Sequence, residues 1–101
     1  MATGPLVIVS GFPGSGKTTL SRALATELAW PLLSKDDIKE ALFDVLGTGD
    51  LAHASKLSRA AHVAMYALAR TMPTAILEAF FQPGLAEPDL NALGRQLIQI
   101  R

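Results

Sequence analysis

The feature that most constrains this chain is a glycine-rich segment that directly follows a short apolar run. The apolar run is residues 6–9, LVIV, and the segment is residues 11–18, GFPGSGKT, which has the spacing G-x-x-x-x-G-K-T. An apolar run without alternation is typical of a strand covered on both faces, as in a parallel sheet. Leu20, Leu24 and Leu28 then recur every four residues and predict a helix with one apolar stripe. We therefore expect a buried strand, a tight glycine turn and a helix in succession.

This glycine turn has the parts that can hold a polyphosphate. Glycines adopt backbone angles that L-residues avoid, so successive amides can surround an anion, and the following helix directs its positive dipole end to the same place. Lys17 can reach the β- and γ-phosphates, and the Thr18 hydroxyl can ligate Mg²⁺. We expect a purine nucleoside triphosphate, with ATP as the leading candidate; a turn that binds nothing is the alternative. The residues expected to hold the nucleotide are Gly11, Pro13, Gly14, Ser15, Gly16, Lys17, Thr18 and Thr19.

Strand and helix patterns alternate along the whole chain. The expected strands are residues 6–9, 30–34, 74–79 and 97–100, and the expected helices are residues 17–28, 36–46, 51–72 and 89–95. This alternation predicts an α/β fold with a parallel sheet and right-handed crossovers. The length of 101 residues leaves room for one domain, residues 1–101.

Composition removes several classes of function. The chain has no cysteine, which excludes disulfides, thiolate chemistry and cysteine-based zinc sites. Its formal net charge is zero, so no overall positive field gathers nucleic acid. No apolar run approaches the length of about 18 residues that a membrane span needs, and the first residues do not look like a signal peptide; the cytoplasm is the default expectation. His53 and His62 lack the i, i+4 spacing of a metal pair, and we expect them in surface or packing roles.

Three stretches of the sequence resemble the small P-loop kinases: residues 11–18, residues 33–39 (LSKDDIK) and residues 76–78 (ILE). More narrowly, they resemble the AAA-type predicted kinases grouped with the zeta toxins, the chloramphenicol phosphotransferases and the 5′-kinase domain of polynucleotide kinase. The resemblance implies a three-layer α/β/α P-loop NTPase fold, Mg-ATP as phosphoryl donor and a small hydroxyl-bearing acceptor. The identity of the acceptor stays open, and nucleic acid is expected only as a 5′ end to be phosphorylated.

The resemblance assigns Asp36 to the acceptor. In this group an Asp after the second strand meets the acceptor hydroxyl, and Asp36 is the matching residue, with Asp37 beside it. We expect the end of the second strand to lie beside the phosphate loop, where a carboxylate can orient a hydroxyl and accept its proton. The alternative is that the two acids only cap the next helix. Lys39 falls where the polynucleotide kinases have an Arg, and a solvated Lys is the simpler interpretation.

Glu78 stands at the end of the third apolar strand, where relatives often carry an Asp near magnesium. Because Glu is one methylene longer, contact with Mg²⁺ through water suits it better than direct ligation. A structural ion pair or a surface position at the strand end is the alternative. Phe80 and Phe81 follow and are expected either to line the acceptor pocket or to pack in the core.

Members of this group usually extend further, with a lid helix that carries arginines, a fifth strand and an adenine-binding loop. The arginines of this chain show no lid pattern; they are Arg22, Arg59, Arg70, Arg95 and Arg101. We therefore expect an amino-terminal portion of a kinase, incomplete after its fourth strand. The expected function is phosphoryl transfer by Lys17, Asp36 and Glu78. The alternatives are a nucleotide-binding or hydrolysing module without acceptor transfer, and a truncated inactive fragment.

Overall fold

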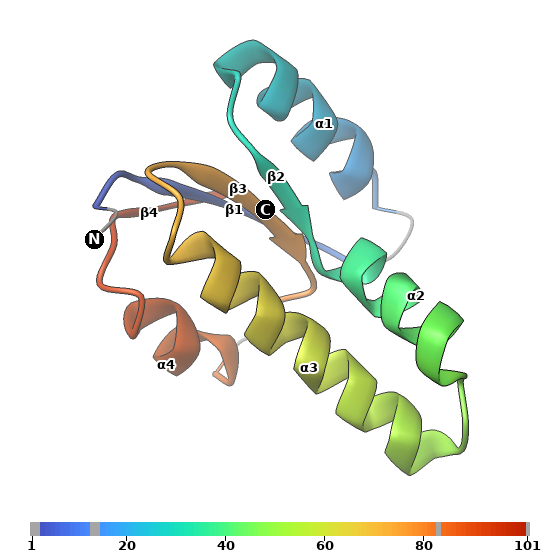
Figure 1. The fold of residues 1–101 in the computed structure, drawn as a ribbon. Helices are drawn as coiled ribbons and strands as arrows, with labels where there is room; N and C mark the ends of the chain where they lie inside the picture. The colour runs from blue at the N-terminus through green and yellow to red at the C-terminus, as the bar shows by residue number, and fades with distance from the viewer. Residues whose placement is uncertain (1–2, 13–14, 83, 101) are drawn as a thin grey trace.

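The computed structural model describes residues 3–12, 15–82 and 84–100, and these form a four-stranded parallel sheet with helices on both faces (Figure 1). The elements in chain order are β1 (Leu6–Ser10), α1 (Lys17–Leu28), β2 (Leu32–Ser34), α2 (Lys35–Leu46), α3 (Leu51–Ala69), β3 (Ala75–Ala79), α4 (Ala86–Asn91) and β4 (Leu97–Ile100). The fold class predicted from the sequence, a three-layer α/β/α arrangement around a parallel sheet, is confirmed.

The strand order is β2-β3-β1-β4, so β3 lies between β1 and β2. The register pairs Ser10 of β1 with Ala79 of β3, and Ser34 of β2 with Glu78 of β3. The sequence leads us to expect the end of the second strand beside the glycine loop, but β3 separates β2 from the strand that leads into that loop. All five residues of β3 are buried, whereas the three residues of β2 are half-buried. The apolar strand takes the position that is covered on all sides, and the short strand takes the edge.

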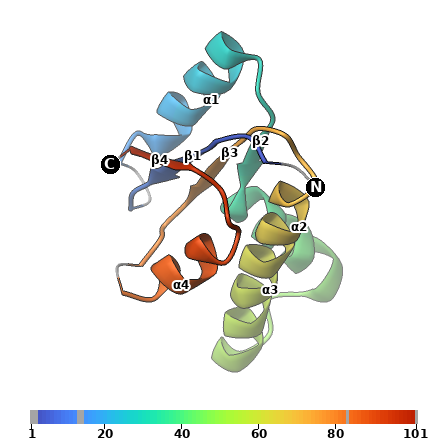
Figure 2. The same cartoon turned by 90° about the vertical axis from the view of Figure 1, so that its left-hand side faces the viewer.

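Alternate residues of the central strands enter two separate cores. Leu6 and Ile8 of β1 face the side of α3 and α4, where they join Met65 in the larger core cluster. Val7 and Val9 face the opposite side, which α1 covers. Figures 1 and 2 show α1 alone on one face of the sheet and α2, α3 and α4 on the other. Because successive side chains of β1 point to opposite faces of the sheet, each face packs against its own helices, and this gives the three layers.

The apolar stripe predicted for α1 is only partly buried. Leu24 packs against the smaller core cluster, but Leu20 and Leu28 are 40% and 41% exposed. The fully covered positions of α1 are instead Lys17 and Ser21, which lie four residues apart on one helix face. The side of α1 that faces the sheet is therefore partly polar, and its polar residues lie at the end that faces the glycine loop.

The later helices differ from prediction at their ends. α3 ends at Ala69, three residues earlier than predicted, because Thr71 donates a hydrogen bond to the carbonyl of Leu68 (2.7 Å) and Pro73 follows. α4 covers residues 86–91 rather than 89–95, and the Glu87 carboxylate accepts a hydrogen bond from the backbone N–H of Gly84 (2.7 Å). No helix within the described ranges is long and apolar enough to cross a membrane.

Arg95 ties three distant segments together just before β4. Its guanidinium donates to the carbonyl oxygens of Gly4 (2.6 Å), Ala69 (3.1 Å), Met72 (2.8 Å) and Pro73 (2.8 Å). These carbonyls belong to the entry to β1, the end of α3 and the turn into β3. The Arg95 guanidinium therefore satisfies carbonyl oxygens that take part in no hydrogen bond of a strand or helix.

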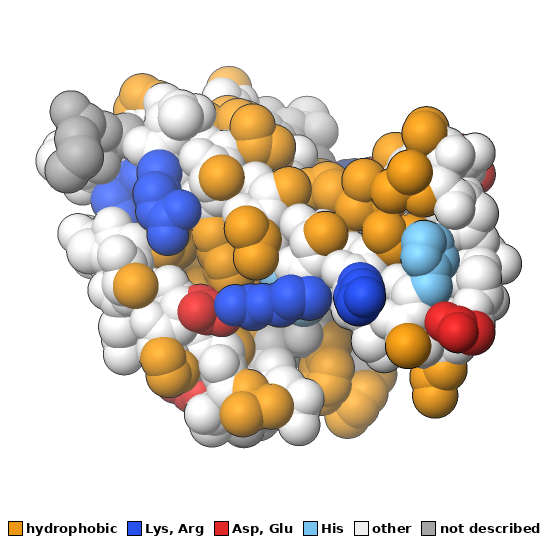
Figure 3. All heavy atoms as spheres, turned by 60° about the horizontal axis from the view of Figure 1, so that its bottom comes forward, with side chains coloured by type: hydrophobic (Ala, Val, Ile, Leu, Met, Phe, Trp, Pro, Cys, Tyr) orange, Lys and Arg blue, Asp and Glu red, His pale blue; other side chains and the backbone are white. Residues whose placement is uncertain are grey.

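Apolar side chains also reach the surface. Val45, Leu46 and Leu51, where α2 joins α3, are 82%, 55% and 83% exposed. Figure 3 shows such side chains spread between charged groups over the face of α3 and α4.

Candidate functional site

The glycine loop ends in a helix start that no side chain caps. Gly16 is the N-cap of α1, with φ 85° and ψ 3°, a left-handed conformation that favours glycine. In contrast, α2 and α3 are capped by the side-chain oxygens of Ser34 and Asp50. The first N–H groups of α1 are therefore available to an external acceptor, and the helix dipole favours an anion there.

The loop before α1 folds closely on itself. The backbone N–H of Ser15 donates to the carbonyl of Phe12 (3.1 Å). A Cβ added at Gly11 would lie 2.6 Å from Oγ of Ser15, so a side chain there would displace that hydroxyl. Pro13 and Gly14, two residues expected to bind phosphate, lie outside the described residues. The described part has the compactness that an anion-binding turn requires.

Lys17 and Asp36 meet across the end of the sheet. Nζ of Lys17 lies 3.7 Å from Oδ2 of Asp36, although the two residues lie in the first turns of different helices. The Lys17 side chain is 7% exposed and the Asp36 side chain 44%. A buried ammonium group needs a counter-charge, and Asp36 supplies it while keeping access to solvent. Asp36 thus reaches the loop even though its strand is not the neighbour of β1.

The capping interpretation of the two acids is wrong. The N-cap of α2 is Ser34, whose Oγ accepts a hydrogen bond from the backbone N–H of Asp37 (3.4 Å). Asp36 and Asp37 lie inside the first turn, where negative charge is favoured by the helix dipole but caps nothing. The Asp36 carboxylate is therefore not engaged in capping.

Glu78 is buried and held by α1. It is 3% exposed and follows Leu77 in the central strand β3. Its Oε2 accepts a hydrogen bond from the Thr18 hydroxyl (3.0 Å), and its Oε1 accepts one from the Ser21 hydroxyl. The expected alternatives, an ion pair or a surface position, do not describe it. Both carboxylate oxygens point at the helix that follows the glycine loop.

Ser21 is a residue that the sequence analysis missed. It is fully buried, and its Oγ also lies 2.6 Å from the carbonyl oxygen of Lys17. The signal was present: Ser21 falls four residues after Lys17 and three after Thr18, on the face that both share. A small polar residue at that position is consistent with a carboxylate on the neighbouring strand.

The oxygen atoms at this place suit Mg²⁺. Thr18 offers a hydroxyl and Glu78 a carboxylate, and Mg²⁺ is commonly held by one or two such oxygens together with phosphate oxygens and water. No group of three or more His, Cys, Asp or Glu residues that could hold a metal occurs in the described part of the chain. The residues present therefore fit a metal that arrives with a nucleotide rather than one enclosed by protein alone.

Two cavities open at this end of the molecule. The first, here called the loop cavity, has about 420 Å³ and is lined by Gly16, Lys17 and Phe12 among others. The second, the side cavity, has about 300 Å³ and lies between α3, α4 and the start of α2. Phe80 and Phe81 line both cavities. Phe81 is also part of the core cluster, so both interpretations offered for it from the sequence apply.

The aromatic side chains link the loop to the side cavity. The rings of Phe12 and Phe80 stack with centroids 4.7 Å apart. His62, expected in a surface or packing role, is half-buried and lies 6.1 Å from both Tyr66 and Phe81. Phe80 therefore contacts the phosphate loop on one side and borders the side cavity on the other.

Burial shifts three titratable groups that line the side cavity. The pKa of Lys35 is lowered by burial and by the positive charge of Lys39. The pKa of His62 is lowered by burial and by the charge of Lys35, so its neutral form is favoured. Burial raises the pKa of Tyr66 to about 12. Nζ of Lys39 lies 5.9 Å from the ring centroid of Phe43, so Lys39 is less solvated than expected.

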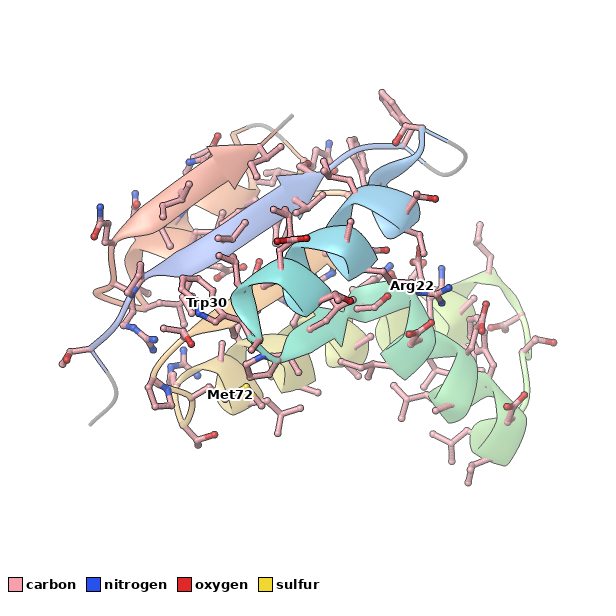
Figure 4. The ribbon with its side chains drawn as sticks, turned by 90° about the horizontal axis from the view of Figure 1, so that it is seen from above. Arg22, Trp30 and Met72 are labelled. Atoms are coloured by element: carbon pink, nitrogen blue, oxygen red, sulfur yellow. The ribbon has the colours of Figure 1, made fainter. Side chains whose placement is uncertain are left out.

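Arg22, one of the arginines that form no lid pattern in the sequence, lies in α1. Arg22 is exposed and extends from α1 toward α2 (Figure 4). Among the described residues, the ion pairs are Lys17–Asp36 and Arg59–Asp89. Arg22 belongs to neither. The same figure shows Trp30 beyond the end of α1 and Met72 beyond the end of α3, where they extend the two cores.

Comparison with solved structures supports the same fold. The chain is 40% identical to a protein described as a putative kinase from Chloroflexus aurantiacus J-10-fl, with a TM-score of 0.91; the match covers all of this chain and 60% of that one. The Pnkp1/Rnl/Hen1 complex contains a chain that is 19% identical with a TM-score of 0.62, over 100% of this chain and 38% of that one. A second structure, of the Pnkp1/Rnl/Hen1 RNA repair complex, gives 22% and 0.63, over 98% and 33%. The chain thus spans less than two thirds of each of these neighbours.

Comparison with families and curated sequences completes the assignment. No curated protein matches the chain significantly. Residues 6–90 match the family described as AAA domain, which is most of the chain. The matched range contains the glycine loop, Asp36 and Glu78. The chain therefore belongs to the AAA domain family, as a P-loop kinase-like nucleotide-binding domain.

Proposed function

We propose that this chain is the nucleotide-binding part of a phosphotransferase that moves the γ-phosphate of Mg-ATP to a hydroxyl group of a small acceptor. The observation that carries the proposal is the 3.7 Å approach of Lys17 Nζ to Asp36 Oδ2. It joins a cation that can stabilise a transferring phosphate to a carboxylate that can accept a proton. Asp36 balances the charge of Lys17 in either kind of protein, but its 44% exposed carboxylate also leaves room for an acceptor hydroxyl to approach.

Most of the expected site residues have a part in this proposal. The N–H groups at the start of α1, with Gly11 and Gly16 allowing the turn, would hold the phosphates, and Thr19 lies in the same first turn. Thr18 and Glu78 would hold Mg²⁺, Glu78 directly or through water. The metal, when bound, offsets charge on the β- and γ-phosphate oxygens.

The proposed transfer can be written with all its atoms. The oxygen of the acceptor hydroxyl forms a bond to the γ-phosphorus, and the bond from that phosphorus to the oxygen bridging it to the β-phosphate breaks. ADP keeps the bridging oxygen and leaves. The hydroxyl proton passes to the carboxylate of Asp36, while Lys17 stays near the transferred oxygens. Lys17 then exchanges part of its contact with Asp36 for contact with phosphate.

Nucleotide binding is tested by calorimetric titration with Mg-ATP and Mg-GTP. Lys17→Ala should weaken binding of both nucleotides by at least tenfold because it removes the buried ammonium. Lys56→Ala, which changes an exposed lysine of α3, is the matched control. Equal heats for wild type and Lys17→Ala, or no heat with either nucleotide, would refute nucleotide binding at this loop.

Acceptor transfer is tested by ADP formation with a panel of sugars, nucleosides and hydroxy acids. Asp36→Asn should lower acceptor-dependent ADP formation by about 10²- to 10⁴-fold, the range for loss of a general base, and should not weaken Mg-ATP binding, because it frees Lys17 for the phosphates. Asp37→Asn, at the neighbouring exposed position in the same helix turn, is the control. If ADP forms at the same rate without any acceptor and Asp36→Asn has no effect, the chain is the hydrolysing module that was the alternative.

A further inference from the structure

The side cavity lies where an acceptor could reach the phosphate loop. Its lining includes Lys35, the first residue of α2, and the next residue is Asp36. Phe80 and Phe81 separate it from the loop cavity and line both. Lys17 and Asp36 do not line the side cavity, but the charges of both act on the Lys35 ammonium group that does. The volume of about 300 Å³ is at the lower limit of ligand pockets, which suits a small molecule.

Lys35 gives this cavity an unbalanced positive charge. The residue is 9% exposed, and no carboxylate of the described residues lies within 4 Å of its ammonium group. Its charged neighbours are Lys39 and Lys17, which repel it, and Asp36, which attracts it. Asp36 is already paired with Lys17. Lys35 therefore feels two ammonium groups and one carboxylate that is already paired, and buried charges of this kind are normally compensated.

The other charged residues of the cavity do not supply the compensation. Arg59 and Asp89 form an ion pair at 3.0 Å, so each balances the other. Figure 3 shows basic and acidic side chains meeting in the middle of the face formed by α3 and α4. His62 favours its neutral form, and Tyr66 stays neutral because burial raises its pKa to about 12. Burial and Lys39 disfavour the charged form of Lys35, and an anionic ligand would supply the compensation that the cavity lacks.

We infer that the side cavity is the acceptor site and that it takes a small hydroxyl compound with an anionic group, a carboxylate or a phosphate ester, held by Lys35. The anionic group would lie at Lys35 and the hydroxyl would point past Phe80 toward Asp36. Neutral groups of His62 and Tyr66 would supply hydrogen bonds to the rest of the molecule. This inference rests on the proposed phosphoryl transfer, but the binding that it requires can be measured separately.

The binding test uses three probes with the same three-carbon hydroxylated skeleton: glycerol 3-phosphate, glycerate and glycerol. Each is titrated into the protein with Mg-ADP present, so that the phosphate loop is occupied. The ring protons of His62 are followed by NMR, because this residue lines the side cavity and not the loop cavity. We expect saturable shifts with glycerol 3-phosphate, glycerate or both, and none with glycerol at the same concentration. A bound anion should also raise the pKa of His62, since negative charge favours imidazolium.

Two variants and one control test the role of Lys35. Lys35→Gln should weaken binding of the anionic probe by about tenfold or more, and Lys35→Arg should retain most of it. Lys56→Gln, at an exposed position outside the cavity, should bind as wild type does. Thermal unfolding of each variant shows whether it is folded, and the comparison of anionic with neutral probe in wild type needs no variant. Equal binding of glycerol and the anions, or Lys35→Gln binding as tightly as wild type, would overturn the inference.

A parallel measurement separates this inference from the proposed function. ADP formation is measured with each probe in wild type and in Asp36→Asn. If the anionic probes bind in the side cavity but do not stimulate ADP formation, the anion site stands and acceptor transfer from it fails. If glycerol alone stimulates ADP formation, transfer stands and the anionic requirement is overturned. If an anionic probe both binds and is phosphorylated, the inference is supported in full.

Discussion

Replacing Arg95 with methionine should destabilise the fold far more than its place outside the helices and strands suggests. The guanidinium donates four hydrogen bonds, to the carbonyls of Gly4, Ala69, Met72 and Pro73, at 2.6 to 3.1 Å. Hydrogen bonds to a charged group contribute about 1.5–3 kcal/mol each. Because part of this site is open to water, which can replace some of these bonds, we expect a loss of about 2–4 kcal/mol rather than the full sum.

That loss is large for a chain of this length. A domain of about 100 residues has a free energy of unfolding of roughly 5–15 kcal/mol. A change of 1 kcal/mol moves the Tm by about 4–8 °C at this size, so Arg95→Met should lower it by about 8–32 °C. Methionine retains apolar packing and removes the donors. Lysine should rescue only part of the loss, because an ammonium group cannot reach carbonyls spread over the fork of a guanidinium.

The assay is thermal and urea unfolding followed by circular dichroism. Arg70→Met is the matched control, since Arg70 is exposed and follows the end of α3 close to the same carbonyls. The reasoning is refuted if Arg95→Met and Arg70→Met shift the unfolding midpoint by the same amount. A full rescue by lysine would show that charge, rather than the geometry of the hydrogen bonds, stabilises this junction.

Three further outcomes are expected. Gly4→Ala should lower the midpoint of thermal unfolding, because its Cβ would lie 2.0 Å from the carbonyl oxygen of Pro73 and the backbone must move. The raised pKa of Tyr66, about 12, means that folding favours the neutral phenol. Its contribution to the free energy of unfolding should be fully present below pH 10 and should fall by up to about 3 kcal/mol as the pH rises to 12. Urea unfolding at a series of pH values measures this loss. Ser21→Ala should raise the Mg²⁺ concentration needed for half-maximal ATP turnover by about tenfold, as for other residues that orient metal ligands, whereas Ser55→Ala should leave it unchanged.

The local parts of this fold could be predicted from the sequence, because their signals are local. The succession of β1, glycine loop and α1 follows from the pattern of residues 6–28, and the bounds of α1 agree with the prediction. The position of β2 at the sheet edge could not be predicted in the same way. Strand order depends on which strand is covered on both faces, and the exposure of β2 arises only after α2 and α3 have packed on each other and on the sheet.

The candidate site, like the fold, has parts that could be predicted from the sequence and parts that could not. The family resemblance and the usual position of ligands at strand ends both predict Asp36 beside the phosphate loop. The structure places its carboxylate 3.7 Å from Lys17, although β3 separates β2 from β1. Ser21 was missed because the helix was interpreted through its leucines. The face that α1 turns to the sheet is set by close approach at a small residue rather than by the largest apolar side chains.

The geometry around Glu78 would let this longer acid act near magnesium, where the resemblance to the small P-loop kinases implies an Asp. Both of its carboxylate oxygens accept hydrogen bonds from one helix, at positions three residues apart. If the Thr18 hydroxyl turns toward a metal that arrives with the nucleotide, Glu78 loses that partner but keeps Ser21, which is fully buried. An Asp at this strand position would be too short to keep both contacts without moving β3 toward α1. The extra methylene of Glu78 and the buried Ser21 therefore act as a pair: the longer side chain reaches the serine hydroxyl, and that hydroxyl holds the carboxylate near the phosphate loop.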